Sequence, residues 1–284
     1  MSDPALLHGG PDALGAAPYD FSTNANACGP CPAALDALRQ ADRSRYPDPA
    51  YTALHARLAA FHGVPAPRIV LAASASEFIH RITAFAARGG LRHAVLPAHG
   101  YGDYARQGDV RVIDRAYAPL RLEGAAAAPP VDAWQLWSPN KALGLTGVRA
   151  AYAIAPGEAQ AAAVQALAPS WPLGADGVAL LQAWTGDAAQ AWLAASLATL
   201  RAWKAAQVAL CASLGWAVLP GSLANFFTAR PPAGDLPGAL QALRAQGIKL
   251  RDCASFGLSG HVRLGVLAPP AQQALAAAWR QCVA

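Results

Sequence analysis

The sequence contains only three lysines, and one of them, Lys141, lies in a segment whose residue types suit covalent chemistry. This segment reads Ser138-Pro-Asn-Lys141-Ala-Leu-Gly-Leu-Thr-Gly-Val-Arg149. A lysine amine can lose its proton and become a nucleophile, whereas an arginine guanidinium stays charged. Lys141 could therefore bond to a phosphorylated aldehyde, with Ser138 and Arg149 binding the phosphate. Taken alone, the segment fits a solvated lysine in a glycine-rich turn equally well.

The spacing Ser138-x-x-Lys141 also occurs in penicillin-binding proteins and β-lactamases, in which the serine is the nucleophile. Those enzymes need Ser-Asp-Asn and Lys-Thr-Gly elements as well, and neither tripeptide occurs in this chain. The other two lysines are Lys204 and Lys249, and neither begins a Lys-Thr-Gly element. Acylation of Ser138 is therefore disfavoured.

The composition predicts a globular enzyme. The 284 residues are 54% hydrophobic and 14% charged, which is unlike a disordered chain. The net charge of +5 comes from scattered arginines without a basic run among aromatic residues, so we expect no nucleic-acid partner. No window has the length and apolar character of a membrane span, and the N-terminus lacks the pattern of a signal peptide. We therefore expect a cytoplasmic protein without a membrane partner.

The five cysteines form an odd set that does not predict a disulfide framework. Cys28-Gly-Pro-Cys31 has the spacing of the thioredoxin redox motif. A redox site of that kind would follow a strand of a small βαβ domain, whereas Thr23-Asn-Ala-Asn26 precedes this motif, so redox function is disfavoured. No second Cys or His pair completes a zinc site, and no metal is predicted.

Short apolar runs alternate with helical runs, which predicts an α/β fold. We expect helices at 31–41, 50–62 and 78–88, and strands at 68–73, 93–97, 110–114, 134–137 and 148–154. Helical patterns dominate from residue 157 onward, interrupted by apolar runs at 216–219, 226–230 and 262–266. These patterns predict a large domain over 32–168 and a smaller α+β domain formed by 1–31 and 169–284.

Polar residues follow several of these strands. Ser74-Ala75-Ser76 comes after the strand at 68–73 and opens a helix, where backbone N–H groups can bind a phosphate. Ser74 and Glu77 also have the spacing of a helix capping box, which is the more common use of such residues. Asp114 ends one strand, and another leads directly into Ser138 and Lys141. Sites in α/β sheets lie at the carboxyl ends of the strands.

The order and spacing of these motifs resemble the fold-type-I pyridoxal-phosphate enzymes of the class I and II aminotransferase family. The most similar branch is threonine-phosphate decarboxylase of cobalamin biosynthesis, and histidinol-phosphate aminotransferase is its near relative. The resemblance implies a mostly parallel sheet, shortened here to about five or six strands, plus a smaller α+β domain. The segments that carry it are His8-Gly9-Gly10, 20–26, 45–49, 74–76, 114–117, 138–149, 224–227, 251–258 and 262–264.

The resemblance implies pyridoxal 5′-phosphate as cofactor. Lys141 would bond to the cofactor and move protons at the substrate Cα, Asp114 would keep the pyridine nitrogen protonated, and Tyr117 would hydrogen-bond the ring oxygen. Tyr101 would stack on the ring. The phosphate would be bound by Ser74, Ala75, Ser76, Ser138 and Arg149, and by Tyr46 of a partner subunit.

The resemblance also implies a substrate and an assembly. Arg263 would bind the substrate carboxylate through its planar guanidinium, and His8 and Arg251 would bind a substrate phosphate. Asn26 would be a further substrate-binding residue. Because His8-Gly9-Gly10 and Arg251-Asp252 match the decarboxylase branch, we expect decarboxylation of a small phosphorylated amino acid, with transamination of the histidinol-phosphate type as the alternative. A homodimer is implied because Tyr46 would act across the interface.

The chain departs from the family pattern between Tyr104 and Asp114. The family has further strands and an Asn-Pro-x-Asn-Pro-Thr-Gly turn there, and the four asparagines of this chain (24, 26, 140 and 225) all lie elsewhere. We therefore expect the strand ending at Asp114 to pair with the strand at 93–97. Arg115 also replaces the glutamate of the family's Asp-Glu-Ala-Tyr motif. These departures leave a non-catalytic relative of the family as a further alternative.

Overall fold

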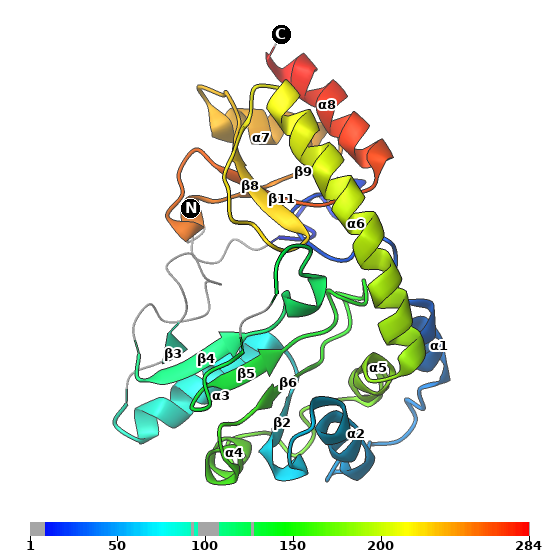
Figure 1. The fold of residues 1–284 in the computed structure, drawn as a ribbon, viewed down its shortest axis with the longest axis vertical. Helices are drawn as coiled ribbons and strands as arrows, with labels where there is room; N and C mark the ends of the chain where they lie inside the picture. Colours follow the sequence, from blue (N-terminus) through cyan, green and yellow to red (C-terminus); the bar gives the residue numbers. More distant parts are fainter. Residues whose placement is uncertain (1–8, 92–93, 96–107, 126–127, 284) are drawn as a thin grey trace. The chain divides into compact units, whose positions relative to one another are not determined.

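The computed structural model describes residues 9–91, 94–95, 108–125 and 128–283. The chain forms two compact units (Figure 1). The first, here called the sheet unit, comprises Gly29–Pro119 and Ala125–Ala194. The second, here called the terminal unit, comprises Met1–Cys28, Leu120–Gly124 and Ala195–Ala284.

Within the described residues, five strands form the sheet of the sheet unit, in the order β2-β6-β5-β4-β3. They span β2 Ile69–Ala72, β3 Ala94–Val95, β4 Val110–Asp114, β5 Trp134–Trp137 and β6 Ala151–Ile154. β3, β4 and β5 pair in parallel, and β6 is antiparallel to both β5 and β2. Four of these described strands therefore point the same way, which confirms the mostly parallel sheet. β3 pairs directly with β4, as the shortened connection predicted.

Helices cover both faces of this sheet. They span α1 Pro32–Gln40, α2 Thr52–His62, α3 Ala75–Arg88, α4 Glu158–Gln165 and α5 Ala175–Trp184, with short 3-10 turns at Ala66–Arg68 and Ala118–Leu120. Trp134 packs on Phe78 of α3, whereas Trp137, three residues later, packs on His62 of α2. Because alternate strand residues face opposite sides, α3 and α2 lie on opposite faces. Residues of β2 and β6 are buried throughout, as strands covered on both faces must be.

α3 illustrates how the sequence forms these elements. It begins after Ser74, whose hydroxyl accepts a hydrogen bond from Glu77 N at 3.0 Å. Phe78, Ile82 and Ala86 recur every four residues and are fully buried, and Phe78 and Ile82 pack in the core of the sheet. The predicted helix is thus held by a capped start and one apolar face.

A buried aromatic cluster joins α2, β6 and α5 of the sheet unit. His62 Nε2 lies 2.7 Å from Tyr152 Oη, and Trp184 Nε1 donates to the same oxygen at 3.0 Å. Burial lowers the pKa of His62 to about 4 and raises the pKa of Tyr152 well above its usual range. His62 is therefore neutral in the folded chain near pH 7, and protonating it would place a charge in this desolvated cluster.

We expect this cluster to make the sheet unit acid-sensitive. The His62 pKa is lower in the folded chain than its ordinary value of 6.5. The contribution of neutral His62 to the free energy of unfolding is therefore fully present above pH 6.5 and is lost as the pH falls toward 4. The loss is at most about 3 kcal/mol, since each pKa unit corresponds to about 1.4 kcal/mol. Urea unfolding of the wild type and His62→Gln between pH 4 and 7 tests this, because the variant should lose less stability. Parallel losses would contradict it.

The terminal unit has an antiparallel sheet of its own. In the described residues, its order is β10-β11-β8-β7, with β7 Ala217–Val218, β8 Phe226–Arg230, β10 Arg251–Asp252 and β11 Val262–Gly265. A separate parallel pair joins β1 Tyr19–Asp20 to β9 Ile248–Lys249. The apolar runs noted at 216–219, 226–230 and 262–266 contain β7, β8 and β11.

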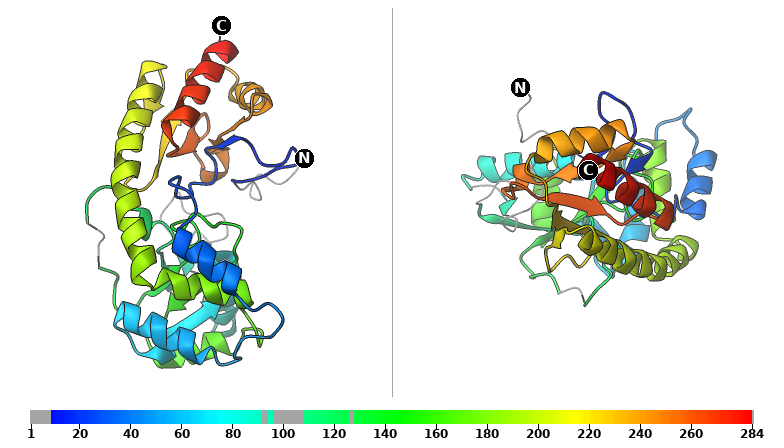
Figure 2. Two further views of the ribbon diagram at one scale, coloured as in Figure 1. Left: turned by 90° about the vertical axis from the view of Figure 1, so that its right-hand side faces the viewer. Right: turned by 90° about the horizontal axis from the view of Figure 1, so that it is seen from above.

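Helices α7 (Leu236–Ala245) and α8 (Pro269–Val283) pack beside each other in the terminal unit, together with the C-terminal part of α6 (Asp187–Ser213) (Figure 2). Their apolar residues share one core with the strands, including Cys211, Leu243, Leu275, Trp279 and Phe227. Trp216 meets Trp279 edge to face, with ring centres 4.8 Å apart. None of the described helices is long and apolar enough to cross a membrane.

The two units divide the chain at different positions from the predicted domains. The predicted boundary fell at residue 168, whereas 169–194 group with the sheet unit. The physical reason is the packing of α5 against α1 and α2, which buries Leu180 and Trp184. In the same region Tyr51 Oη donates to Leu173 O at 2.7 Å.

Candidate active site

The strand directions bring the candidate cofactor residues to one edge of the sheet. β2, β4 and β5 run in parallel, so their carboxyl ends share that edge, and the amino end of antiparallel β6 lies there as well. The register agrees, because Ala72 pairs with Ala151 and Trp137 with Tyr152. The segments that this arrangement collects contain Ser74, Asp114, Tyr117, Ser138, Lys141 and Arg149.

The predicted catalytic residues follow two adjacent strands of this edge. Lys141 Nζ lies 5.0 Å from the centre of the Tyr117 ring, an arrangement that attracts a cation to the aromatic face. Asp114 ends β4, and its Oδ1 accepts a hydrogen bond from Ala116 N at 2.8 Å. The structure therefore places the amine against the phenol and fixes the carboxylate at the neighbouring strand end.

Asn140 organises the loop around Lys141, a role that the sequence interpretation missed. Asn140 Oδ1 accepts hydrogen bonds from Ser138 Oγ at 3.0 Å and from Lys141 N at 2.9 Å. Its Nδ2 donates to Thr146 O at 3.5 Å and to Val148 O at 3.4 Å. The only signal in the sequence was an asparagine between a hydroxyl residue and the lysine, since short polar side chains often bond to nearby backbone.

Gly144 allows this loop to pack closely. Its φ is +68°, and a Cβ added there would lie 2.6 Å from Gly29 O. Only glycine tolerates both the left-handed backbone and this approach.

We therefore expect Gly144→Ala to destabilise the sheet unit by about 2 kcal/mol or more. Gly147→Ala is the matched control in the same loop, because nothing lies within 4 Å of its added Cβ. The control should stay within about 1 kcal/mol of the wild type. Urea unfolding midpoints measure both, and equal effects of the two substitutions would contradict the packing argument.

The start of α3 is a complete capping arrangement. Besides the bond from Glu77 N to Ser74 Oγ, Glu77 Oε2 accepts from Ala73 N at 3.1 Å. Arg81 Nε donates to Glu77 Oε1 at 2.8 Å, which balances the carboxylate. Ser74 thus caps the helix, and the helix N-terminus at Ala75 and Ser76 remains the part that suits a phosphate.

Arg149 and Tyr46 line one hollow of about 520 Å³ on the sheet unit, together with Arg43 and Arg45. Tyr46 is 80% exposed, and its ring stacks on Trp171 with the centres 4.6 Å apart. Asp176 lines the same hollow and pairs with Arg43 at 2.7 Å. The sequence interpretation did not single out Trp171.

In the terminal unit, Arg251 and Arg263 are direct cross-strand partners on β10 and β11. Their Cζ atoms lie 5.1 Å and 5.4 Å from the centre of the Phe256 ring. Like charges directly opposite each other destabilise a sheet. An anionic ligand would relieve this repulsion, so the pair suits a substrate with negative groups.

Both guanidiniums are anchored. Arg251 is buried, and its Nη2 donates to Ser255 Oγ at 2.9 Å. Arg263 Nη2 donates to Ser22 O at 3.2 Å, and its buried Nε has no hydrogen-bond partner among the described residues. A buried guanidinium N–H without an acceptor is costly, which favours a ligand at Arg263.

Asn26 is buried in the terminal unit. Its Nδ2 donates to Ser196 Oγ at 2.8 Å, and its Oδ1 accepts from Cys28 N at 3.1 Å. These bonds hold the segment after β1 in place. The predicted roles of His8 and Tyr101 fall outside the residues that the structure describes.

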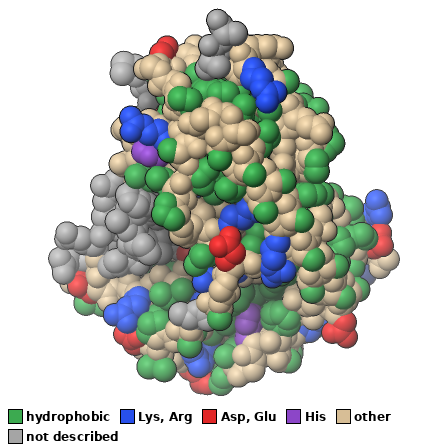
Figure 3. Space-filling model, turned by 45° about the horizontal axis from the view of Figure 1, so that its top comes forward, with side chains coloured by type: hydrophobic (Ala, Val, Ile, Leu, Met, Phe, Trp, Pro, Cys, Tyr) green, Lys and Arg blue, Asp and Glu red, His purple; other side chains and the backbone are tan. Residues whose placement is uncertain are grey.

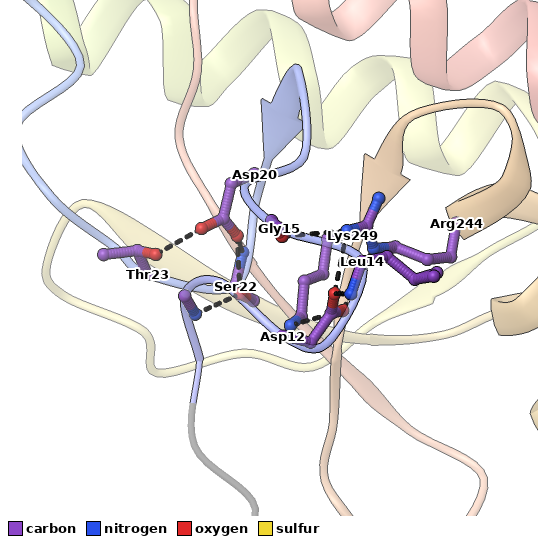
Figure 4. Close-up of polar contacts among 9 residues, drawn as sticks. Asp12, Leu14, Gly15, Asp20, Ser22, Thr23, Arg244 and Lys249 are labelled. Atoms are coloured by element: carbon purple, nitrogen blue, oxygen red, sulfur yellow. Dashed lines mark hydrogen bonds and ion pairs between the residues drawn. The ribbon is translucent and has the colours of Figure 1, made fainter.

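The segment that follows His8 is anchored by charges (Figure 4). Asp12 accepts hydrogen bonds from Arg244 Nη2 and Lys249 Nζ, each at 2.8 Å. Arg244 and then Lys249 hold the pKa of Asp12 well below its usual range. Gly10 N donates to Ser22 Oγ at 2.9 Å, so the segment also contacts the residue whose carbonyl binds Arg263.

The structure gives Cys28 and Cys31 no redox character. Burial raises the pKa of the Cys28 thiol, and Cys31 is buried at the start of α1. Reactive cysteines need a lowered pKa, so we interpret both as structural residues.

On the face drawn in Figure 3, basic and acidic side chains are interspersed.

The comparison with protein families decides the class of the chain. The family model for aminotransferase class I and II matches residues 106–279, which include Lys141 and Arg263. The chain belongs to this family. The predicted family is thereby confirmed, together with its cofactor, pyridoxal 5′-phosphate.

Similar proteins support the same class. Histidinol-phosphate aminotransferase 2 of Burkholderia mallei is 27% identical over 352 aligned residues, covering 99% of this chain and 94% of that protein. The alignment is longer than the 284 residues of this chain, as expected for a shortened member.

Two solved structures show the fold-type-I architecture. Histidinol-phosphate aminotransferase from Sinorhizobium meliloti, in complex with pyridoxal-5′-phosphate, has a TM-score of 0.79 at 19% identity, covering 100% of this chain and 97% of that one. L-threonine-O-3-phosphate decarboxylase from Porphyromonas gingivalis has a TM-score of 0.75 at 18% identity, covering 93% and 98%. These similarities confirm the predicted fold class.

The described residues fit the cofactor. The Lys141 amine suits the aldehyde, and the neighbouring Tyr117 hydroxyl suits the ring oxygen. Asp114 suits a protonated pyridine nitrogen. Arg149 and the start of α3 supply positive character for a phosphate. The donor set therefore complements each polar group of pyridoxal phosphate.

Proposed function

We propose that the chain is a pyridoxal-phosphate-dependent decarboxylase of L-threonine O-3-phosphate, as in cobalamin biosynthesis. The observation that carries this proposal is the cross-strand pair of Arg251 and Arg263, both of which contact the Phe256 ring. Two fixed guanidiniums match a small substrate with two anionic groups. In this proposal Arg263 binds the carboxylate, while Arg251 and His8 bind the phosphate.

The sheet unit supplies the chemistry. Bound pyridoxal phosphate draws electrons from the bonds at the substrate Cα. Lys141 holds the cofactor through its amine and delivers a proton to Cα, and Asp114 keeps the pyridine nitrogen protonated. Tyr117 hydrogen-bonds the ring oxygen. Ser138, Arg149 and the start of α3 bind the phosphate.

The proposed enzyme is a homodimer. Tyr46 is exposed on the sheet unit and is held by the ring of Trp171. In the proposed assembly, Tyr46 of one copy reaches the cofactor phosphate of the other. Light scattering tests this part, and a monomer that still binds the cofactor at full strength would contradict it.

Transamination of the histidinol-phosphate type is the second candidate. The specific observation in its favour is that the sequence relative from Burkholderia mallei carries that name. Arg263 would then bind the carboxylate of an amino-acid donor. The missing segment between Tyr104 and Asp114 motivates a third candidate, a non-catalytic relative, but the contact between Lys141 and Tyr117 argues against it.

One assay distinguishes these candidates. The purified protein with pyridoxal phosphate is incubated with threonine phosphate, and carbon dioxide and the phosphorylated amino alcohol are measured. In parallel, histidinol phosphate is supplied with 2-oxoglutarate, and glutamate is measured. We expect carbon dioxide from the first mixture. Glutamate from the second mixture alone would establish the transaminase, and no product from either would favour the non-catalytic relative.

A further inference from the structure

We infer that Asn140 is a positioning residue that sets the cofactor-binding geometry of Lys141, Ser138 and Arg149, an inference that rests on the proposed function. Backbone hydrogen bonds such as Leu145 N to Asn140 O at 2.8 Å support the loop. The Asn140 side chain adds bonds to both ends of the loop.

The hydrogen-bonding capacity of Asn140 is fully used. An asparagine amide offers two acceptor sites on its oxygen and two N–H donors. Here Oδ1 receives two hydrogen bonds and Nδ2 makes two, while only 6% of the residue is exposed. The bond from Lys141 N fixes which end of the amide is the oxygen, since a backbone N–H can only donate. A fully satisfied buried amide has one orientation, and it imposes that orientation on its neighbours.

Two of these bonds involve residues proposed to bind the cofactor, and the other two act on the segment that leads to Arg149. The bond from Lys141 N fixes the backbone that carries the amine, and the bond from Ser138 Oγ orients the hydroxyl. The bonds to Thr146 O and Val148 O fold the far end of the loop back, and Val148 directly precedes Arg149. Asn140 therefore links the amine to both phosphate-binding side chains.

Ser138 has a single hydroxyl proton, which Asn140 Oδ1 accepts. An anionic residue at position 140 would hold the proton more firmly and would repel the phosphate. A purely structural role for Asn140 predicts no such effect of charge.

The test uses Asn140→Ala and Asn140→Asp. The alanine variant loses all four bonds, whereas the aspartate variant keeps the two acceptor bonds and adds a negative charge. The measurements are the dissociation constant for pyridoxal phosphate, followed by tryptophan fluorescence, and the pH midpoint of the visible absorption band. We expect both variants to bind at least about tenfold more weakly, with a shifted midpoint, because misplaced supporting groups typically cost that much.

Gln272→Ala is the matched control. Gln272 is also a buried amide, and its Nε2 donates to Trp203 O and Leu267 O in the terminal unit. This variant should lower the urea midpoint without changing cofactor affinity or the pH midpoint. Should the Asn140 variants behave in the same way, Asn140 would be structural only and the inference would be wrong.

A measurement on the wild type covers the case in which the variants fail to fold. Amide hydrogen exchange of the cofactor-free protein should show Lys141 N–H strongly protected, because it donates to a buried acceptor. Exchange at the rate of an exposed loop would overturn the inference. If the wild type bound no pyridoxal phosphate at all, both the proposed function and the inference about Asn140 would fail. Normal cofactor binding by both Asn140 variants would refute only the inference about Asn140.

Discussion

Lys141→Ala is expected to abolish borohydride-stable attachment of pyridoxal phosphate and to lower kcat/KM by about 1000-fold or more. The reason is chemical, since no other group near this loop can bond to an aldehyde and also move a proton at Cα. Lys141→Arg sharpens the test, because arginine keeps a positive charge that can lie on the Tyr117 ring but cannot form the bond. Both variants should fold and should lack the adduct.

Lys249→Ala and Lys204→Ala are the controls for this prediction. Lys249 is paired with Asp12, and Lys204 is buried with its amine bonded to Glu123 Oε1. Both should retain the adduct, since neither lies in the cofactor loop. Peptide mass spectrometry after borohydride locates the modified lysine. An adduct that persists in Lys141→Ala would remove Lys141 from the mechanism.

Arg263→Lys is expected to raise KM by about 100-fold for every substrate that carries a carboxylate. Loss of a fork-shaped, desolvated contact to an anion typically costs about 2 to 5 kcal/mol. Arg263 is fixed by Ser22 O and by the rings of Phe226 and Phe256, so a lysine cannot reproduce its direction. Cofactor affinity should not change.

Arg251→Lys tests which anionic group of the substrate each arginine binds. KM should rise for threonine phosphate but not for unphosphorylated threonine, whereas Arg263→Lys should affect both. Steady-state kinetics with the two compounds measures the difference. Equal effects of both variants on both compounds would show that the arginine pair recognises charge without assigning one group to each guanidinium.

The sequence was most informative where a strand ends in a residue with chemistry. The strands ending at Asp114 and Trp137 were predicted with the bounds that the structure has, and the apolar run at 226–230 coincides with β8. Buried and less buried residues alternate along these strands, and each strand ends at a polar residue or a turn. The pairing of β3 with β4 also followed from the sequence, because the shortened connection leaves no room for further strands.

Other features left no such signal. β1, β9 and β10 have two residues each, too few for any periodicity. The grouping of α5 with the sheet unit depends on α1 and α2, which are more than 100 residues away in sequence. Propensity and spacing do not report such distant contacts.

Some features of the candidate site could likewise be predicted from the sequence, whereas others depend on the folded structure. Residue types and order predicted Lys141, Asp114, Tyr117 and Arg149 as site residues, and the strand register brings their segments to one edge. The bonds of Asn140 are a property of the folded loop, and the ring of Trp171 meets Tyr46 only through the fold. The direct opposition of Arg251 and Arg263 likewise depends on strand register.

The most direct test of the central claim is the visible spectrum of the purified wild-type protein with added pyridoxal phosphate, recorded before and after borohydride. We expect an absorption band of lysine-bound cofactor, which borohydride removes, leaving a stable adduct at Lys141. That result would establish cofactor binding despite the missing segment. No band and no adduct at Lys141 would contradict the proposed function and would favour a non-catalytic member of the family.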